Sequence, residues 1–421
     1  MDKPVSYTKC LLKAFIVTVV VGLLVLGIVA KHMTDVDKKS HSQMAKKDEE
    51  NQTKTVTKDD GKQHKSVKED YRKKIKSDDK TNMLEEKKKN VQPASPDRVS
   101  KSYLVLWYDM LSYLHKRNYA KTANFSPCEY NNCKLTLKRK MANVSDAVIF
   151  QGRYMPKNTG FKRPVGQVWI FAEHEAPPVY KSLAKKFGLY NHRDAFNWSM
   201  TYDKALADIH LPYGEIRRHK HYISKDYDKI ALNKTKGALI ITSHCQVVSR
   251  RTQFLKELKK YTDVTILGKC GTPWDCGKWL FHDNCFDILN HTYAFYLAFE
   301  NALCHQYFTE KLYENFLYDT LFVTRSGLPH EASSIFPEGS VIDSDQFKNA
   351  QELGGFLNKV QNDKRDYAKR LATKSQYYSI NYRESYQRAL CDICYRLNHQ
   401  DLYYKNIPDI LQVFNTQHSC R

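Results

Sequence analysis

Residues 293–315 read YAFYLAFENALCHQYFTEKLYEN, and this stretch decides the expected fold because it joins an apolar strand to the start of a helix. Residues 293–299 are aromatic and aliphatic, as in a buried strand of a parallel sheet. Thr309 is a suitable N-cap for a helix over residues 310–317. Because a helix N-terminus beside the carboxyl end of a strand attracts phosphate, we expect a phosphate-binding site here.

Other apolar segments alternate between strand and helix patterns along residues 101–375. Two successive α/β units of this kind predict two Rossmann-like domains with a cleft between them. The expected strands are residues 146–151, 167–173, 196–202, 237–242, 264–267 and 340–342, and the expected helices are residues 179–187, 251–261 and 350–359.

The first 100 residues differ in composition from the rest. Residues 14–30 form an almost wholly apolar, uncharged run, and residues 11–13 extend it to a length that spans a bilayer if Lys13 snorkels to the interface. A cleaved signal peptide is the alternative, but its apolar core is ordinarily shorter. Residues 31–100 contain 19 basic and 14 acidic residues and few aliphatic ones, which predicts a disordered stem. The interleaved acids and the lack of an aromatic stacking pattern argue against nucleic-acid binding.

The residues after the apolar run have features of a lumenal protein. Ten of the eleven cysteines follow it, as expected in an oxidising compartment. Lysines flank the run on both sides, so the charge rule orients it only weakly. Better support for a type II, single-pass topology with a lumenal head comes from six N-x-S/T triplets, the acceptor sites for N-glycosylation, all of which follow the run. The candidate N-glycosylation residues are Asn51, Asn124, Asn143, Asn197, Asn233 and Asn290.

Basic residues near the expected strand ends could bind phosphate. Lys311 can neutralise a donor phosphate and Glu310 can bond a ribose or base, although the same two residues also suit a capped helix with a surface ion pair. Arg251 opens an expected helix, where a guanidinium can clamp a pyrophosphate or lie in solvent. Arg250, directly before it, has the same chemistry.

Acidic residues past the expected strand 167–173 are candidates for a general base. Glu175 follows the strand and is succeeded by two prolines that fix the loop. A carboxylate at this position can take a proton from an attacking hydroxyl. Glu173 qualifies chemically as well, and either acid could be an exposed loop residue.

The segments FYLAFEN and TEKL resemble the donor-site motif of the α1,3-fucosyltransferases, glycosyltransferase family 10, and the resemblance extends over about residues 101–374. It implies the GT-B arrangement of two facing Rossmann-like domains. It also implies inverting transfer of L-fucose from GDP-β-L-fucose to the 3-hydroxyl of a GlcNAc in glycoprotein glycans, in the Golgi membrane. The resemblance assigns the base to Glu175, six residues after Trp169, and donor binding to Arg251, Tyr307, Glu310, Lys311, Glu300 and Asn301.

The resemblance also bears on the rest of the chain. It implies that Cys391 and Cys394 are tied back to Cys128 and Cys133. It implies no required cofactor and no metal site, and it leaves cation stimulation and a homodimer open. The expected parts are a cytoplasmic tail (1–10), a transmembrane anchor (11–30), a stem (31–100), an acceptor-side domain (101–230), a GDP-fucose-binding domain (231–375) and a C-terminal segment that packs on the first domain (376–421).

Two departures from the family pattern raise alternatives. Where the family has an arginine and an Asp-x-Asp, this chain has Asp203 to Asp208 with one extra residue, and only Asp208 is kept. The loop after the strand near Thr324 lacks the family's Pro-Val-Val-x-Gly turn. A degenerate member that binds GDP-sugar or glycan without turnover is therefore the first alternative. The second is a binding protein for anionic glycans, suggested by the basic balance of residues 101–421.

Overall fold

The computed structural model describes residues 101–111, 123–179, 188–274, 284–413 and 420–421, all within one compact unit. The expected tail, anchor and stem, Asn51 and most of the expected helix 179–187 lie outside the described residues. Within the described part of the chain, no helix is both long enough and apolar enough to span a bilayer. The anchor at residues 11–30 therefore stays a prediction.

Six parallel strands form the first sheet, in the spatial order β2-β1-β3-β4-β5-β6. All five residues of β3 and all six of β4 are buried, because a parallel sheet has both faces covered. The helix α14 (Tyr382–Asn398) packs on one face, and the segment around α16 (Ile410–Val413) packs on the other. The strands are β1 (Tyr103–Trp107), β2 (Cys133–Thr136), β3 (Ala147–Gln151), β4 (Val168–Glu173), β5 (Trp198–Thr201) and β6 (Ile209–His210).

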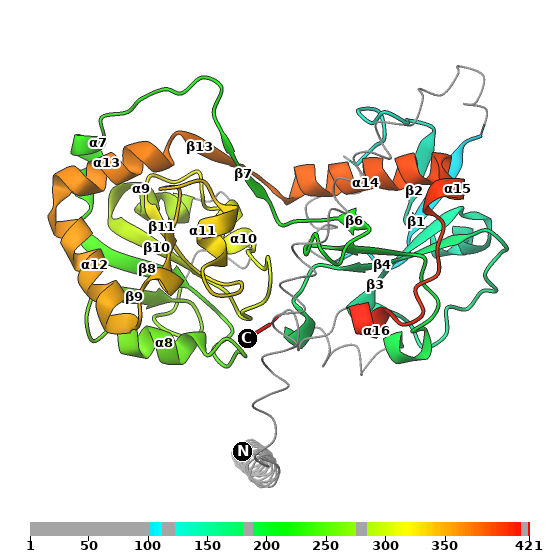
Figure 1. Cartoon of the computed structure of the whole chain (residues 1–421), viewed down its shortest axis with the longest axis horizontal. Helices are drawn as coiled ribbons and strands as arrows, with labels where there is room; N and C mark the ends of the chain where they lie inside the picture. The colour runs from blue at the N-terminus through cyan, green and yellow to red at the C-terminus, as the bar shows by residue number, and fades with distance from the viewer. Residues whose placement is uncertain (1–100, 112–122, 180–187, 275–283, 414–419) are drawn as a thin grey trace, which may run out of the picture. The chain divides into compact units, whose positions relative to one another are not determined.

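Five parallel strands form the second sheet, in the order β12-β11-β10-β8-β9. The helices α7, α8, α12 and α13 share a hydrophobic core with one face of it, and α9, α10 and α11 lie over the other face (Figure 1). These elements are β8 (Lys236–Ile241), β9 (Val264–Leu267), β10 (Tyr293–Phe299), β11 (Leu321–Arg325), β12 (Ile342–Asp343), α7 (Tyr227–Asn233), α8 (Arg251–Leu258), α9 (Ile288–His291), α10 (Glu310–Tyr313), α11 (Glu331–Ile335), α12 (Ala350–Asn362) and α13 (Lys364–Lys374).

Both sheets follow the same doubly wound strand order. Numbered within each sheet, the strands run 2-1-3-4-5, with a sixth strand at the edge of the first sheet. The strand order reverses between β1 and β3 in the first sheet and between β8 and β10 in the second. Ligands of such folds bind at the carboxyl ends of the strands where the order reverses, so the ends of β8 and β10 are the place to look for a site.

Most of the expected strands and helices are present at nearly the expected residues, and the two-sheet α/β fold is confirmed. The helix expected over residues 310–317 is wrong in length, because α10 ends at Tyr313. The Asn315 side chain donates to the carbonyl of Lys311 at 3.0 Å, and this bond competes with continuation of the helix. The sequence interpretation also missed β1 and β2.

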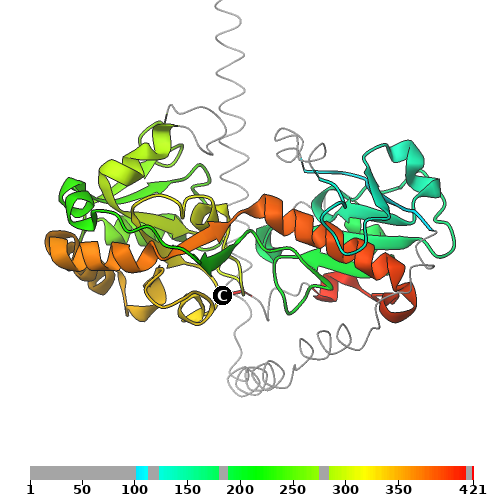
Figure 2. The ribbon, with the colours of Figure 1, turned by 90° about the horizontal axis from the view of Figure 1, so that it is seen from above.

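A two-stranded antiparallel ribbon leads the chain back to the first sheet. It pairs β7 (Glu215–Arg218) with β13 (Tyr377–Ile380), directly before α14. Figure 2 shows α14, in orange-red, running from this ribbon onto the first sheet. The short α15 (Gln400–Tyr403) follows. The C-terminal segment therefore packs against the first sheet, in agreement with the resemblance.

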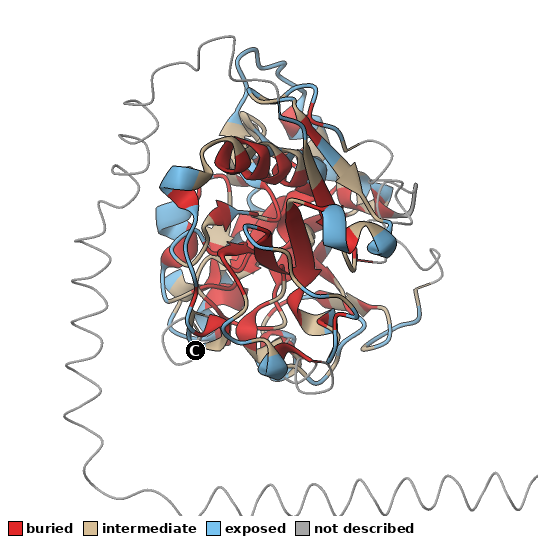
Figure 3. Cartoon of the chain, turned by 90° about the vertical axis from the view of Figure 1, so that its right-hand side faces the viewer, coloured by how far each residue is buried: buried red, intermediate tan, exposed pale blue. Residues whose placement is uncertain are grey.

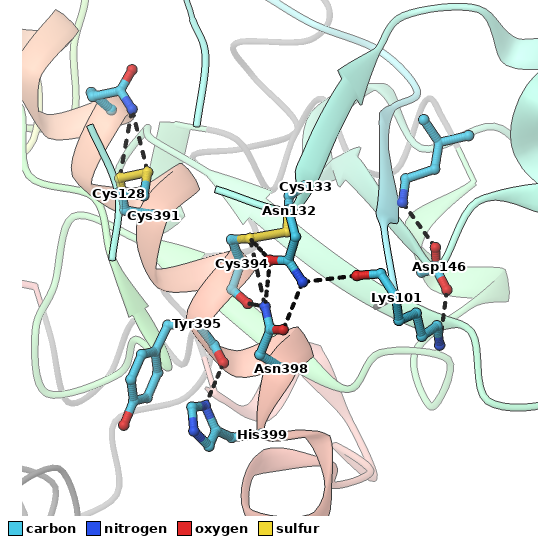
Figure 4. The surroundings of a disulfide bond; sticks show 12 residues. Lys101, Cys128, Asn132, Cys133, Asp146, Cys391, Cys394, Tyr395, Asn398 and His399 are labelled. Atoms are coloured by element: carbon cyan, nitrogen blue, oxygen red, sulfur yellow. Dashed lines mark hydrogen bonds and ion pairs between the residues drawn. A yellow bond between two sulfur atoms is a disulfide. The ribbon is translucent and has the colours of Figure 1, made fainter. Parts of the chain in front are cut away.

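Two disulfides fix α14 to the first sheet. They join Cys128 to Cys391 and Cys133 to Cys394, the pairs of regions that the resemblance implied. Beside the second bond, Asn132 donates to Asn398 at 2.8 Å (Figure 4). Two further disulfides between described residues join Cys245 to Cys270 and Cys304 to Cys420.

Figure 3 shows buried residues in red and exposed residues in pale blue. The expected glycosylation residues differ in their burial. Asn197 is completely buried: its amide oxygen accepts from the backbone of Trp169 at 2.8 Å, and its nitrogen donates to the carbonyl of Lys405 at 2.7 Å. A glycan needs an accessible amide, so the expectation for Asn197 is wrong for the folded protein. Asn290 is half-buried, and both its amide atoms are hydrogen bonded. The exposed candidates are Asn124, Asn143 and Asn233.

Candidate active site

A cavity of about 260 Å³ lies at the carboxyl ends of β8 and β10, where the strand order of the second sheet reverses. Glu175 and Tyr213 line it from the first sheet's side of the molecule. Its lining combines carboxylates, cations and aromatic rings: Glu175, Tyr213, Ile241, Thr242, Ser243, His244, Arg251, Phe286, Tyr296, Asn301, Tyr307, Glu310, Lys311 and Asn315. Six of the seven residues predicted from sequence to be catalytic or donor-binding are in this set, and Glu300 is not.

Glu175 contacts the second sheet's half of the site through Tyr307. The Tyr307 hydroxyl donates to Glu175 Oε2 at 2.6 Å, and Arg153 Nη1 lies 3.6 Å from Glu175 Oε1. About a quarter of the Glu175 side chain is exposed, so a ligand in the cavity can reach its carboxylate. Burial, together with the charge of Glu175, raises the pKa of Tyr307, which keeps the phenol protonated and able to donate.

Glu173 has a structural position. Its carboxylate is fully buried and pairs with Arg153. It also accepts from the backbone nitrogens of His174 at 2.9 Å and Glu175 at 3.0 Å. These bonds fix the turn that follows β4, and the turn aims Glu175 into the cavity.

Lys311 lies between two carboxylates. Its ammonium is 2.9 Å from Glu300 Oε2 and 3.2 Å from Glu310 Oε1, and it donates to Thr309 Oγ1 at 2.8 Å. Although burial opposes the charge, the two neighbouring carboxylates raise the pKa of Lys311. The ammonium therefore stays protonated and can attract an anionic ligand.

Glu300 lies outside the cavity and binds two residues next to it. It is buried, and it accepts from the backbone and the hydroxyl of Thr309 at 2.9 and 2.8 Å as well as from Lys311. Because its carboxylate is occupied and does not line the cavity, the expected direct donor contact by Glu300 is not what the structure shows. Glu300 instead orients Thr309 and Lys311.

Two predicted residues present unused polar groups. Asn301 Oδ1 and Arg251 Nε are buried without a hydrogen-bond partner, and both residues line the cavity. The remaining guanidinium nitrogens of Arg251 are occupied, donating to Phe299 O at 2.8 Å, Thr242 Oγ1 at 2.6 Å and His244 O at 2.9 Å. Arg251 is therefore buried and held by three hydrogen bonds, with its Nε unoccupied, and the expected contact of its guanidinium with a pyrophosphate stays a prediction. Burial lowers its pKa.

Sequence reasoning missed the residues that hold Glu175 from its own side. Arg153 follows β3, and its position beside β4 in the parallel sheet was the signal for its pairing with the acids there. His174 is buried, and its ring stacks on Tyr213 with centroids 3.8 Å apart. Burial lowers the pKa of His174 to about 3, so it is neutral at physiological pH and fills space rather than transferring protons.

Three acidic residues outside the cavity, Asp208, Asp343 and Asp345, make contacts within the fold. Asp208 accepts from the backbone of Ser199 at 2.9 Å, next to β5 and β6. Asp343 accepts from Ser333 Oγ at 2.8 Å, and Asp345 pairs with Arg421. Within the described ranges, no cluster of three or more histidine, cysteine or acidic side chains could hold a metal ion.

Two family models match this chain, one over each of the two sheets. Residues 231–413 match the family model "Glycosyltransferase family 10 (fucosyltransferase) C-term", and residues 100–214 match "Fucosyltransferase, N-terminal". Glycoprotein 3-alpha-L-fucosyltransferase A of Drosophila melanogaster is 30% identical over 239 residues, which are 56% of this chain and 46% of that protein. Alpha-(1,3)-fucosyltransferase C of the same organism is 28% identical over 66% of this chain and 68% of its own length.

A crystal structure of an α1,3-fucosyltransferase with GDP-fucose is 16% identical and aligns with a TM-score of 0.45 over 75% of this chain and 96% of that chain. The match to the first of the two Drosophila proteins spans about half of that relative. The two family models together match well over half of this chain, and each contains one of the two sheets. The chain therefore belongs to glycosyltransferase family 10, the fucosyltransferases.

Proposed function

We propose that this protein transfers L-fucose, with inversion, from GDP-β-L-fucose to the 3-hydroxyl of a GlcNAc in glycoprotein glycans. One observation carries the proposal: the candidate base Glu175 and the cation Lys311 line one cavity, and Tyr307, from the same segment as Lys311, donates to Glu175. A base on one side and a phosphate-binding group on the other is what direct displacement at a sugar nucleotide requires.

The proposed step is a single displacement. The acceptor 3-hydroxyl attacks the anomeric carbon of fucose while the bond from that carbon to the β-phosphate oxygen breaks. Glu175 accepts the hydroxyl proton, and GDP leaves with the electron pair of the broken bond. Tyr307 donates to the other side of the Glu175 carboxylate, and Arg153 lies beside it, so the base is held in one orientation.

The leaving diphosphate needs positive charge and hydrogen-bond donors. Lys311 supplies a fixed ammonium, and Arg251 supplies its unoccupied Nε–H group at the cavity wall. The unpartnered Asn301 Oδ1 can accept from a ribose hydroxyl or a base N–H group. Stabilisation by groups already held in place avoids reorganisation during the reaction.

A Golgi location with the catalytic part in the lumen belongs to the same proposal. It is supported by the apolar run at residues 14–30 and by four disulfides between described residues, which suit an oxidising compartment. Type II topology predicts that glycans are added at the exposed residues Asn124, Asn143 and Asn233.

The test is transfer of labelled fucose from GDP-fucose by a secreted fragment of residues 101–421. Acceptors are an N-glycan core, a LacNAc and a LacdiNAc oligosaccharide, because the acceptor GlcNAc is the open part of the proposal. Glu175→Gln keeps the size of the side chain and an acceptor for Tyr307 but cannot take a proton. Glu257→Gln, in the exposed ion pair with Lys260, is the matched control.

We expect transfer by the unchanged fragment and by the control variant Glu257→Gln. In Glu175→Gln we expect a loss of transfer of at least about 100-fold with GDP affinity retained. Full activity of Glu175→Gln would contradict the assignment of the base. GDP binding without transfer to any of the three acceptors would favour the degenerate alternative.

A further inference from the structure

His305 joins the two halves of the molecule beside the cavity. Its Nδ1 lies 2.9 Å from Asp203 Oδ2, and its Nε2 lies 3.2 Å from Glu331 Oε1. Asp203 follows β5 of the first sheet, and Glu331 begins α11 of the second sheet. Both carboxylates are buried, and the His305 side chain is 12% exposed.

This geometry suits an imidazolium between two ionised carboxylates. A neutral imidazole carries one N–H group, so one of its nitrogens would present a lone pair to a carboxylate. A protonated ring donates to both carboxylates and brings positive charge to a buried pair of acids, which would otherwise be uncompensated. Asp203 and Glu331 are the ionisable side chains that the described structure brings against the ring.

The bridged histidine belongs to the segment that carries Tyr307. Glu331 also accepts from the backbone nitrogen of Gln306 at 3.1 Å, and the Gln306 side chain accepts from the backbone of Lys204 at 2.9 Å. Gln306 has a positive φ of 53°, a conformation that surrounding contacts must hold in a residue other than glycine. The bonds at positions 305 and 306 therefore set the direction in which Tyr307 leaves the loop.

We propose that Asp203, His305 and Glu331 form a positioning clamp, which holds Tyr307 against Glu175 while the imidazole is charged and releases it when the imidazole is neutral. The inference rests on the proposed function for its effect on transfer, but the clamp itself is a property of the fold. It gives a role to Asp203, which lies where this chain departs from the family pattern.

Asp203 and Glu331 stabilise the protonated form of His305. Burial opposes protonation, but the hydrogen bond and charge of Asp203 and the charge of Glu331 raise the pKa of His305 above its ordinary value. The clamp is therefore closed in a mildly acidic compartment and opens at alkaline pH.

The first experiment measures kcat/KM for transfer from pH 5.5 to 9 in the fragment of residues 101–421. His305→Gln removes the charge, and His305→Lys makes it independent of pH in this range. His291→Gln, in the exposed pair with Asp287, is the matched control. The melting temperature of every variant is recorded, so that loss of folding can be told apart from a displaced Tyr307 side chain.

We expect kcat/KM of the unchanged protein and the control to fall on the alkaline side, with a midpoint above 6.5. His305→Gln is expected to be about 10- to 100-fold slower at acidic pH, with this decline absent. His305→Lys is expected to keep more activity than His305→Gln and also to lose the decline. An alkaline decline that persists unchanged in both variants would overturn the clamp.

A second measurement does not depend on catalysis. The His305 ring is titrated by NMR in histidine-labelled protein, and amide exchange is followed over residues 301–308. We expect a raised pKa for the ring and amide protection that falls as the ring deprotonates. A ring that titrates at its ordinary pKa, with protection independent of pH, would overturn the clamp. Absence of transfer by the unchanged protein would instead count against the proposed function alone.

Discussion

Arg251 is a buried residue with three hydrogen bonds to the fold, and its substitution can separate its structural role from its ligand-binding role. The guanidinium donates to Phe299, Thr242 and His244, and an ammonium in its place cannot reach all three acceptors. We expect Arg251→Lys to lower the free energy of unfolding by about 1–3 kcal/mol, because buried acceptors lose their donors. Urea denaturation measures the change.

The neighbouring exposed residue is the control for this substitution. Arg250→Lys is expected to change stability by less than about 0.5 kcal/mol, as surface substitutions usually do. Unchanged stability of Arg251→Lys together with weakened GDP binding would mean that the guanidinium serves the ligand rather than the fold. The sequence placed Arg251 at the site correctly but could not show its partners, since Phe299 lies 48 residues away and meets it only through sheet pairing.

The ribbon of β7 and β13 passes close to α10, and Gly214 makes this contact tight. A Cβ atom at Gly214 would lie 2.5 Å from the carbonyl oxygen of Ile380 and 2.5 Å from the ring of Tyr313. We expect Gly214→Ala to destabilise the protein by about 1–3 kcal/mol through overpacking. Gly355→Ala, in α12 with no atom near the new Cβ, is expected to stabilise it by about 0.5–1 kcal/mol. Equal effects in thermal unfolding would refute the close approach.

The disulfides of α14 hold an element that is distant in sequence from its sheet. Cys128 and Cys391 are 263 residues apart, so the bond restricts the unfolded chain strongly. We expect the double variant Cys128→Ser, Cys391→Ser to lose about 2–5 kcal/mol of stability in urea, while α14 stays on its apolar core. Retained stability in the double variant would show that the apolar contacts of α14 suffice.

At this scale the sequence was most informative where the pattern is local. The strand β10 and the helix α12 could be predicted from the sequence. Burial of β10 on both faces leaves a continuous apolar run, and burial of α12 on one face leaves a helical periodicity of apolar residues. The length of α10 was not, because Asn315 ends it through a side-chain bond that composition does not reveal. Burial of Asn197 was hidden for a similar reason: a sequon is defined by three residues, whereas its exposure depends on the C-terminal segment packed over it.

At the scale of the whole molecule, the alternating strand and helix patterns predicted two α/β sheets. The contacts between residues around the first sheet and residues around the second could not be predicted. Asp203 and His305 are separated by 102 residues and meet only after both sheets have formed. A single sequence contains no signal for such a pair. The candidate base and the phosphate-binding residues were recognised through local motifs, whereas the contact of Tyr307 with Glu175 needed the fold.

The clamp should also appear in the pH dependence of global stability. A folded-state pKa of His305 above its unfolded value contributes stability that is fully present below about pH 6.5 and is lost as the pH rises through the folded value. Buried Lys374 acts oppositely: burial lowers its pKa to about 7, so its effect on the free energy of unfolding becomes more favourable as the pH rises above 7.

The difference in unfolding free energy between the unchanged protein and His305→Gln isolates the effect of the histidine. We expect this difference in unfolding free energy, from urea titrations between pH 5.5 and 9, to be largest at the acidic end and to shrink toward pH 9. A difference that is constant with pH would show that the pKa of His305 is the same in the folded and unfolded states, which would contradict a clamp that holds the ring charged.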